Sequence, residues 1–208
     1  MAAPGRVPPG RAGRIWLARR LDLARRAASR LDQKLRILRT EQAHAALLVE
    51  RTRPVWEERC REAETWLLRA AVLTGRTGLR PAAVPPLAEV SVVWTTSMGA
   101  TYPTEAVCVI PEPDSDQAPS SSSAVIEATA AYRAALDAAV RHAVAEWAAR
   151  AIDAEVATTS QRLRGVQDRW IPRLDEALHQ LRLSLDEAEQ AEGVRLRWAA
   201  RQQGRRVP

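Results

Sequence analysis

The residues best suited to catalysis or metal binding are three histidines and two cysteines, and their spacing matches no known reactive pattern. None of His44, His142 and His179 has another histidine or a cysteine three or four residues away, the spacing that places two ligands on one helical face. Cys60 and Cys108 belong to no CxxC motif. We interpret the histidines as surface or packed side chains and the cysteines as free thiols. We expect no metal and no cofactor.

The motifs that mark common active sites are absent from the sequence. The only lysine, Lys34, follows Gln33 instead of the glycine of a phosphate-binding loop, and no G-x-S-x-G or H-E-x-x-H segment occurs. Acidic pairs such as Asp186-Glu187 fall in helix-favouring sequence, where they are typical of solvated or helix-stabilising charges. The sequence therefore predicts a protein without an active site of its own.

Arginine supplies nearly all the positive charge, and it gathers toward both ends of a chain with a formal net charge of +6. Between Arg11 and Arg39 the only acidic residues are Asp22 and Asp32, and the tail "VRLRWAARQQGRR" contains none. If the two ends meet, they form a basic tip. A solvated surface, a nucleic-acid site and a complementary protein cavity are all compatible with such a tip, although no recognition helix or RNA-binding aromatic motif favours nucleic acid.

These charges must be positioned by long helices. From Leu17 to Leu73, seam positions recur at alternating steps of four and three, and most of them are apolar. A sustained period of 3.5 residues predicts a coiled-coil helix, which we place at 13–74. Pro54 lies inside it, where we expect a bend, and Gly75 follows at a position where glycine commonly ends a helix.

The central region, 75–123, has a different composition. "EVSVVWTT" and "EAVCVI" are rich in β-branched residues and predict two strands, with "SMGATYPT" between them as a turn around Met98 and Gly99. We expect a β-hairpin whose loop is longer than two residues. The following "PEPDSDQAPSSSS" is typical of a flexible linker.

A second long helix is predicted at 124–203. Its apolar seam shifts at Trp170-Ile171-Pro172, and a proline beside a change of seam is typical of a kinked helix. The predicted fold is all-α dominated: a long antiparallel two-helix coiled coil with a small central β-hairpin and a flexible linker. Residues 1–12 are expected to be disordered, and 204–208 form a short tail.

Two segments carry a family resemblance. Residues 9–35, "PGRAGRIWLARRLDLARRAASRLDQKL", open with Pro-x-Arg and continue into basic pairs and a Leu-x-Leu-Ala-x-Arg core. Residues 162–197 contain Ile-Pro-Arg-Leu-Asp at 171–175, followed by a long acidic stretch and a closing Arg-Leu-Arg. With Met98-Gly99 between them, and in this order, these segments resemble the D subunits of the V/A-type ATPases, which form the rotor axle of the central stalk.

The resemblance implies a non-catalytic shaft that transmits torque between ATP hydrolysis or synthesis in a hexamer of A and B subunits and ion translocation by a membrane ring. It implies as partners the A and B subunits, a small F subunit and a C/d-type subunit that links the shaft to the ring. It also implies a cytoplasmic location, peripheral to the inner face of the cell membrane. Because the sequence has no run of about 18 apolar residues, we expect no membrane span of its own.

The candidate sites follow from the charge distribution, the prolines and the shift of seam, together with the same resemblance. The candidate hexamer contacts are Arg11, Arg14, Arg19, Arg20, Arg195, Arg197 and Arg201; the candidate kink or coupling residues are Pro54, Ile171, Pro172 and Arg173; and the candidate hairpin or foot contacts are Met98 and Gly99. The alternative is a basic coiled-coil protein that binds nucleic acid or serves as a scaffold. A steep loss of binding with salt would mark a nucleic-acid partner.

Overall fold

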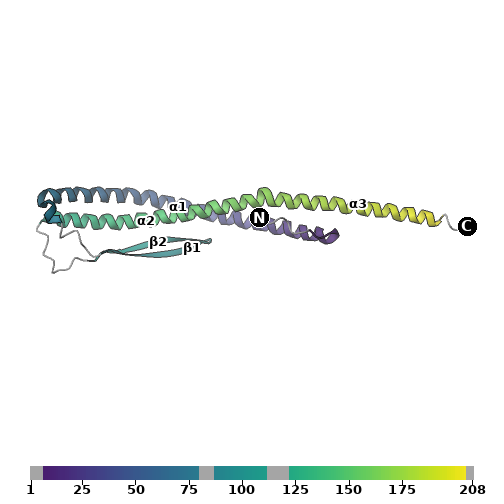
Figure 1. The fold of residues 1–208 in the computed structure, drawn as a ribbon, viewed down its shortest axis with the longest axis horizontal. Helices are drawn as coiled ribbons and strands as arrows, with labels where there is room; N and C mark the ends of the chain where they lie inside the picture. Colours follow the sequence, from purple (N-terminus) through teal and green to yellow (C-terminus); the bar gives the residue numbers. More distant parts are fainter. Residues whose placement is uncertain (1–6, 80–86, 112–121, 205–208) are drawn as a thin grey trace. The chain divides into compact units, whose positions relative to one another are not determined.

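A computed structural model describes residues 7–79, 87–111 and 122–204 of the chain (Figure 1). Three sequence expectations fall partly outside these ranges: the disordered start of the chain, the flexible linker and the short tail. The described residues form α1 (Gly10–Leu79), β1 (Glu89–Ser97), β2 (Ala100–Val109), α2 (Ser123–Arg164), the π-helical turn η2 (Gly165–Trp170) and α3 (Ile171–Gly204). This confirms the predicted fold class of a long helical coiled coil with a small antiparallel hairpin.

The chain divides into two compact units. The first unit contains the residues up to Leu35 and those from Thr158 onward, and the second unit contains Arg36–Ala157. In each unit one segment of α1 runs antiparallel to a segment of the C-terminal half of the chain.

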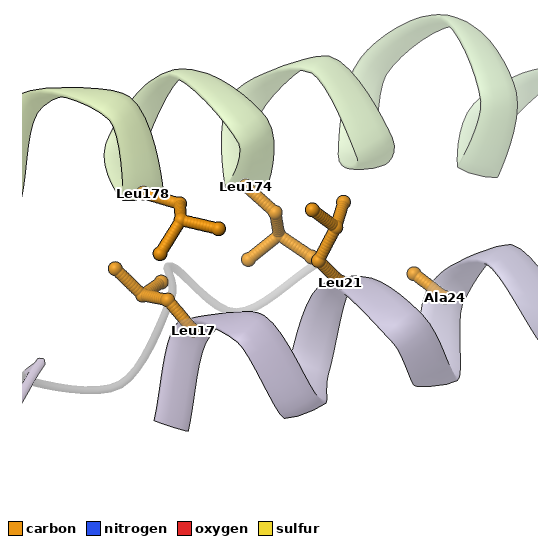
Figure 2. Packing of buried hydrophobic residues seen from close by; sticks show 5 residues of the cluster. All are labelled: Leu17, Leu21, Ala24, Leu174 and Leu178. Atoms are coloured by element: carbon orange, nitrogen blue, oxygen red, sulfur yellow. The ribbon is translucent and has the colours of Figure 1, made fainter. Parts of the chain in front are cut away.

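Leucines hold the first unit together. Leu17 and Leu21 of α1 pack with Leu174 and Leu178 of α3, and Ala24 completes the buried cluster. Figure 2 shows Leu17 facing Leu178 and Leu21 facing Leu174, which fixes the antiparallel direction. Each buried leucine contributes about 1.5–3 kcal/mol. The regular heptads of α1 form this seam because they keep one apolar stripe turned toward the partner helix.

A glycine lets the residues before α1 lie across it. Gly13 is buried, and a Cβ atom there would stand 2.0 Å from the carbonyl oxygen of Pro8 and 3.1 Å from a methyl carbon of Leu181. Real Cβ atoms do not approach a backbone oxygen so closely, so any side chain at Gly13 would displace the segment before α1.

Alanines form most of the seam in the second unit. Ala63 packs with Ala131 and Ala135, and a further cluster joins Ala70 of α1 to the first two turns of α2. The regular heptad fails here in two places, because Arg59 is exposed and Leu73 is 70% exposed. Cys60 takes the inward position beside Ala63 instead. A straight α-helix has 3.6 residues per turn, so a strict 3.5-residue pattern drifts off the contact face.

The backbone of α1 keeps helical angles through Pro54 and leaves them at Gly75, where φ is 64° and ψ is −179°. This left-handed φ is accessible to glycine without steric cost. Gly75 therefore ends the continuous part of α1, and the helical residues up to Leu79 follow the break. Leu79 packs against the cluster at the start of α2.

The π-helical turn explains the shift of the C-terminal seam. At its end the backbone N–H of Ile171 donates to the carbonyl oxygen of Val166, five residues back. A π-helical turn contains more residues than an α-helical turn, so it displaces every later residue around the helix axis. Buried Leu163 lies before this turn and buried Leu174 lies after it, and the apolar seam shifts between them. Pro172 directly follows this wide turn within an uninterrupted helical run, where the regular pattern of hydrogen bonds four residues back is already interrupted.

The hairpin loop is shorter than the sequence predicted. Ser97 pairs with Ala100, so only Met98 and Gly99 lie between the strands. Their φ values are 51° and 81°, as a two-residue type I′ turn requires. The expectation of a longer loop was wrong because methionine rarely adopts a positive φ and gives no signal for such a turn.

A β-bulge accommodates the proline of β2. The register shifts between Val93 and Trp94, so that Val93 pairs with Glu105 and Trp94 pairs with Pro103. Thr104 is the additional residue, and its hydroxyl donates to the carbonyl of Val93 at 3.3 Å. Proline cannot donate to the ladder, and a bulge is one of the few places in a strand that tolerate it.

Candidate functional site

The outer end of the first unit carries the N-terminal arginines. Arg11 pairs with Glu189 of α3 at 2.8 Å, and this hydrogen bond and the charge of Glu189 raise the pKa of the guanidinium. Arg14 and Arg19 are exposed. The ion pair shows that the first turn of α1 lies beside residue 189, so α3 continues past the start of α1 (Figure 1).

This projecting part of α3 is a single helix that places the C-terminal arginines apart from the N-terminal ones. From Glu189 to Gly204 it extends about 20 Å, at about 1.5 Å per residue. Arg195, Arg197 and Arg201 all lie on it. The structure therefore does not join the seven predicted arginines into one two-helix tip. Large apolar side chains are exposed on the same projection: Val194 by 58%, Leu196 by 65% and Trp198 by 64%.

The guanidinium of Arg20 lies close to two tryptophan rings. Its guanidinium carbon is 4.8 Å from the ring centre of Trp16 and 5.7 Å from that of Trp170. Trp16 stands one turn earlier on α1, while Trp170 is the last residue of η2. Cation–π contacts of this kind contribute about 0.5–1 kcal/mol each when exposed and more when desolvated.

A groove of about 790 Å³ surrounds this stack. Its lining includes Ile15, Arg19 and Leu23 of α1 and Val166 of η2, together with the stack itself and small side chains. The lining contains two arginines and no acidic residue, so the groove is apolar with a positive centre. Sequence reasoning named Arg19 and Arg20 but missed the groove. The four-residue spacing of Trp16 and Arg20 was a visible signal, whereas Trp170 joins them only through the pairing of the helices.

The other predicted site residues are dispersed. Pro54 is exposed in the α1 segment of the second unit, and Ile171 is half-buried at the start of α3 beside exposed Pro172 and Arg173. Met98 and Gly99 form the tip of the hairpin. Pro54 and the hairpin tip belong to the second unit, whereas Ile171, Pro172 and Arg173 belong to the first.

A polar cluster in the second unit was also missed. His142 is only 5% exposed, and its Nδ1 atom lies 3.0 Å from Oγ1 of Thr52. Its Nε2 atom lies 3.6 Å from Oε1 of Glu146, one turn further along α2. Trp56 stacks on the imidazole with ring centres 5.1 Å apart. The His142–Glu146 spacing is readable in the sequence, but the roles of Thr52 and Trp56 depend on which residues of α1 face α2.

The described residues thus form helix seams, a groove beside Arg20 and an exposed, arginine-bearing projection. Within residues 7–79, 87–111 and 122–204, no three histidine, cysteine or acidic side chains gather as metal ligands would. In the same ranges no helix is both long and apolar enough to cross a bilayer. A coiled coil with an exposed, arginine-bearing projection belongs to the class of helical stalk proteins.

The comparison with protein families makes this class specific. Residues 15–201 match the family of ATP synthase D subunits, so the chain belongs to that family. The members of this family are non-catalytic stalk subunits of rotary ATPases, and the chain is therefore a stalk component of such a complex. No curated protein sequence matches the chain.

Proposed function

We propose that this chain is the central rotor shaft of a V/A-type ATPase. In this role it transmits torque between the A/B hexamer, where ATP is hydrolysed or made, and the membrane ring that translocates ions. The observation that carries the proposal is a helix pair with a regular leucine seam in the first unit, in a chain of the ATP synthase D-type family. Such a seam resists separation and twisting of its two helices, which a torque-bearing element requires.

The exposed projection of α3 supports contact with the hexamer. Val194 and Leu196 are two residues apart, about 200° around a helix, so their apolar side chains point in nearly opposite directions. A helix with apolar residues on opposite sides suits a cavity that encloses it better than a flat surface. Arg195, Arg197 and Arg201 then face polar or acidic groups of that cavity, as do Arg11 and Arg14 nearer the coil.

The other proposed partners are the F subunit and a C/d-type subunit, which would bind the second unit. The β-hairpin, with Met98 and Gly99 at its tip, and the exposed apolar residues Leu68 and Val72 of α1 are candidate contacts for them. The complex holds the chain on the cytoplasmic side, peripheral to the membrane. In this role the chain needs no cofactor, because ATP is hydrolysed or made on the neighbouring A and B subunits.

Affinity purification tests the proposal directly. The tagged full-length chain is recovered from native membranes treated with nuclease and washed at moderate salt, and its partners are quantified by mass spectrometry. We expect A and B subunits in equal amounts and in excess of the chain. Recovery of the chain alone, or loss of all partners on nuclease treatment, would refute the rotor role.

The coupling residues provide a second test. Pro172→Ala should leave the helix content intact and reduce the ion transport obtained per ATP hydrolysed in the assembled complex, because it alters the turn that sets the seam of α3. Arg30→Ala is the control, because Arg30 is exposed on α1, lies outside that turn and is not among the candidate hexamer contacts. Unchanged coupling in Pro172→Ala would show that this turn has no part in torque transmission.

A further inference from the structure

We propose that the groove around Arg20 binds a short acidic protein segment that also carries an apolar side chain. In the assembled complex this segment belongs to the subunits that surround the shaft, an assignment of partner that rests on the proposed function. The groove would then be a discrete binding site on one side of the first unit, distinct from the exposed projection of α3.

The surroundings of Arg20 suit the binding of a carboxylate. The two indole rings of Trp16 and Trp170 lie within cation–π distance of its guanidinium. A planar guanidinium presents a fork of N–H donors that matches the two oxygens of a carboxylate. Among the described residues Arg20 forms no ion pair, and the nearby Asp22 is held by Arg26 at 2.5 Å. The groove thus has a positioned cation without an acidic partner.

The walls of the groove require an apolar group as well. Ile15 is 51% exposed and Leu23 is 61% exposed, and both line the groove beside Arg19. Two large aliphatic side chains beside a pair of guanidinium groups form a surface for a segment in which an acidic residue neighbours an aliphatic one. A volume of about 790 Å³ accommodates a few such side chains.

The same features disfavour nucleic acid. Single-stranded nucleic acids bind through bases stacked on aromatic rings, but the rings of Trp16 and Trp170 are engaged by Arg20. A duplex backbone requires a series of cations at phosphate spacing, whereas this groove contains only Arg19 and Arg20 between apolar walls. Charge complementarity and apolar lining together therefore favour a protein segment.

The π-helical turn gives the groove its shape. Val166 and Trp170 both line the groove, and both belong to η2. The wide turn displaces Trp170 from the position that a continuous α-helix would give it. The turn that resets the seam therefore also places the second tryptophan beside Arg20.

The first experiment measures binding of the full-length chain to a reconstituted ring of A and B subunits from the same organism. Arg20→Met removes the charge and keeps an unbranched side chain beside the tryptophans. We expect it to weaken binding about tenfold to hundredfold, as loss of a charge-assisted hydrogen bond does. Arg30→Met is the matched control, because Arg30 is exposed on the same helix, does not line the groove and is not among the candidate hexamer contacts; it should change binding less than about twofold. Equal effects of the two variants would overturn the groove proposal while leaving the rotor role intact.

A second experiment is independent of the rotor role. The probe is a synthetic peptide of alternating leucine and aspartate, and the indole N–H signals of Trp16 and Trp170 are followed by NMR in the full-length chain. We expect saturable shifts that disappear in Arg20→Met and with a peptide in which lysine replaces aspartate. Absence of shifts with the acidic peptide would overturn the proposal even if the ring binds. Stronger shifts with a DNA duplex, or shifts that depend only on the concentration of the chain, would assign the groove to nucleic acid or to a second copy and overturn it as well.

Discussion

Oγ1 of Thr52 and Nδ1 of His142 lie 3.0 Å apart inside the helix pair of the second unit. The imidazole is almost fully buried, is stacked on Trp56 and has Glu146 on its other side. The alanines around this pair are small and interdigitate little, so they do not fix the position of α1 along α2. A buried polar pair is satisfied in only one alignment, so Thr52 and His142 fix the register of this part of the coil.

Thr52→Val tests that role. The valine keeps the volume of the threonine but removes the hydroxyl, which leaves a buried ring nitrogen of His142 without its partner. We expect the free energy of unfolding to fall by about 1–3 kcal/mol, measured by urea denaturation at constant pH. The double variant Thr52→Val with His142→Leu should recover part of this loss, because neither side chain then requires a hydrogen bond. Additive losses in the double variant would show that the two residues are not coupled.

Leu174→Ala tests the seam of the first unit. Leu174 is 2% exposed and packs against Leu17 and Leu21, so its truncation leaves a cavity. The expected loss is about 2–5 kcal/mol in the free energy of unfolding. Leu183→Ala is the matched control on the same helix, because Leu183 is 44% exposed; it should cost less than about 0.5 kcal/mol. Similar losses for both variants would mean that the seam has been assigned to the wrong face of α3.

The sequence predicted the helices and the first-unit seam because their information is local. A regular 3.5-residue repeat identifies the inward face of α1 from Leu17 to Ala45 without knowledge of the partner helix. The prediction failed at Arg59 and Leu73, where the 3.5-residue pattern has drifted off the contact face of a helix with 3.6 residues per turn. It also failed at the hairpin turn, because Met98 adopts a backbone conformation that its residue type does not indicate.

The groove around Arg20 was less predictable from the sequence, because it depends on how α1 pairs with the C-terminal helix. Single arginines such as Arg20 were identified from the charge distribution and the family resemblance, but the contact with Trp170 requires both the antiparallel alignment and the additional residue of the π-helical turn. No residue type marks a π-helical turn. Its only trace in the sequence is the shift of the seam before Pro172, which was interpreted as a kink.

The two prolines within helical sequence should differ in their effect on stability. Pro54 lies among helical residues of α1, far from either end, whereas Pro172 lies in the first turn of α3 after η2. Pro54→Ala should therefore raise the free energy of unfolding by up to about 3 kcal/mol, and Pro172→Ala should change it by less than about 1 kcal/mol. Thermal and urea unfolding of both variants measure the difference. A larger gain at Pro172 than at Pro54 would contradict the view that the π-helical turn accommodates Pro172.

Tyr102 should give the protein a specific alkaline sensitivity. Burial raises the pKa of this phenol on β2, and the charge of Glu41 and a hydrogen bond to it raise it further. The unfolded chain ionises the phenol near its ordinary pKa of about 10, while the native state still holds the proton. The stabilisation is therefore complete below about pH 10 and is lost as pH rises toward the raised native pKa. Urea denaturation between about pH 9 and 11 should show this loss in the native sequence and a smaller one in Tyr102→Phe. Identical pH profiles for the native sequence and Tyr102→Phe would show that Tyr102 does not contribute to the contact between hairpin and helix.

Trp198→Ala should weaken binding of the chain to the A/B ring without lowering its free energy of unfolding. Trp198 is 64% exposed on the single-helix projection of α3, beyond the contact of Arg11 with Glu189. Its removal should leave the free energy of unfolding within about 0.5 kcal/mol of the native value, because no packing within the chain is lost. Binding to the reconstituted A/B ring should weaken by about 1–3 kcal/mol, since an aromatic side chain that becomes buried at an interface is a common source of affinity. Leu183→Ala, on the same helix but before the projection, is the control for the binding measurement. If Trp198→Ala destabilised the chain and left ring binding unchanged, the projection would be packed within the protein and would not enter the hexamer.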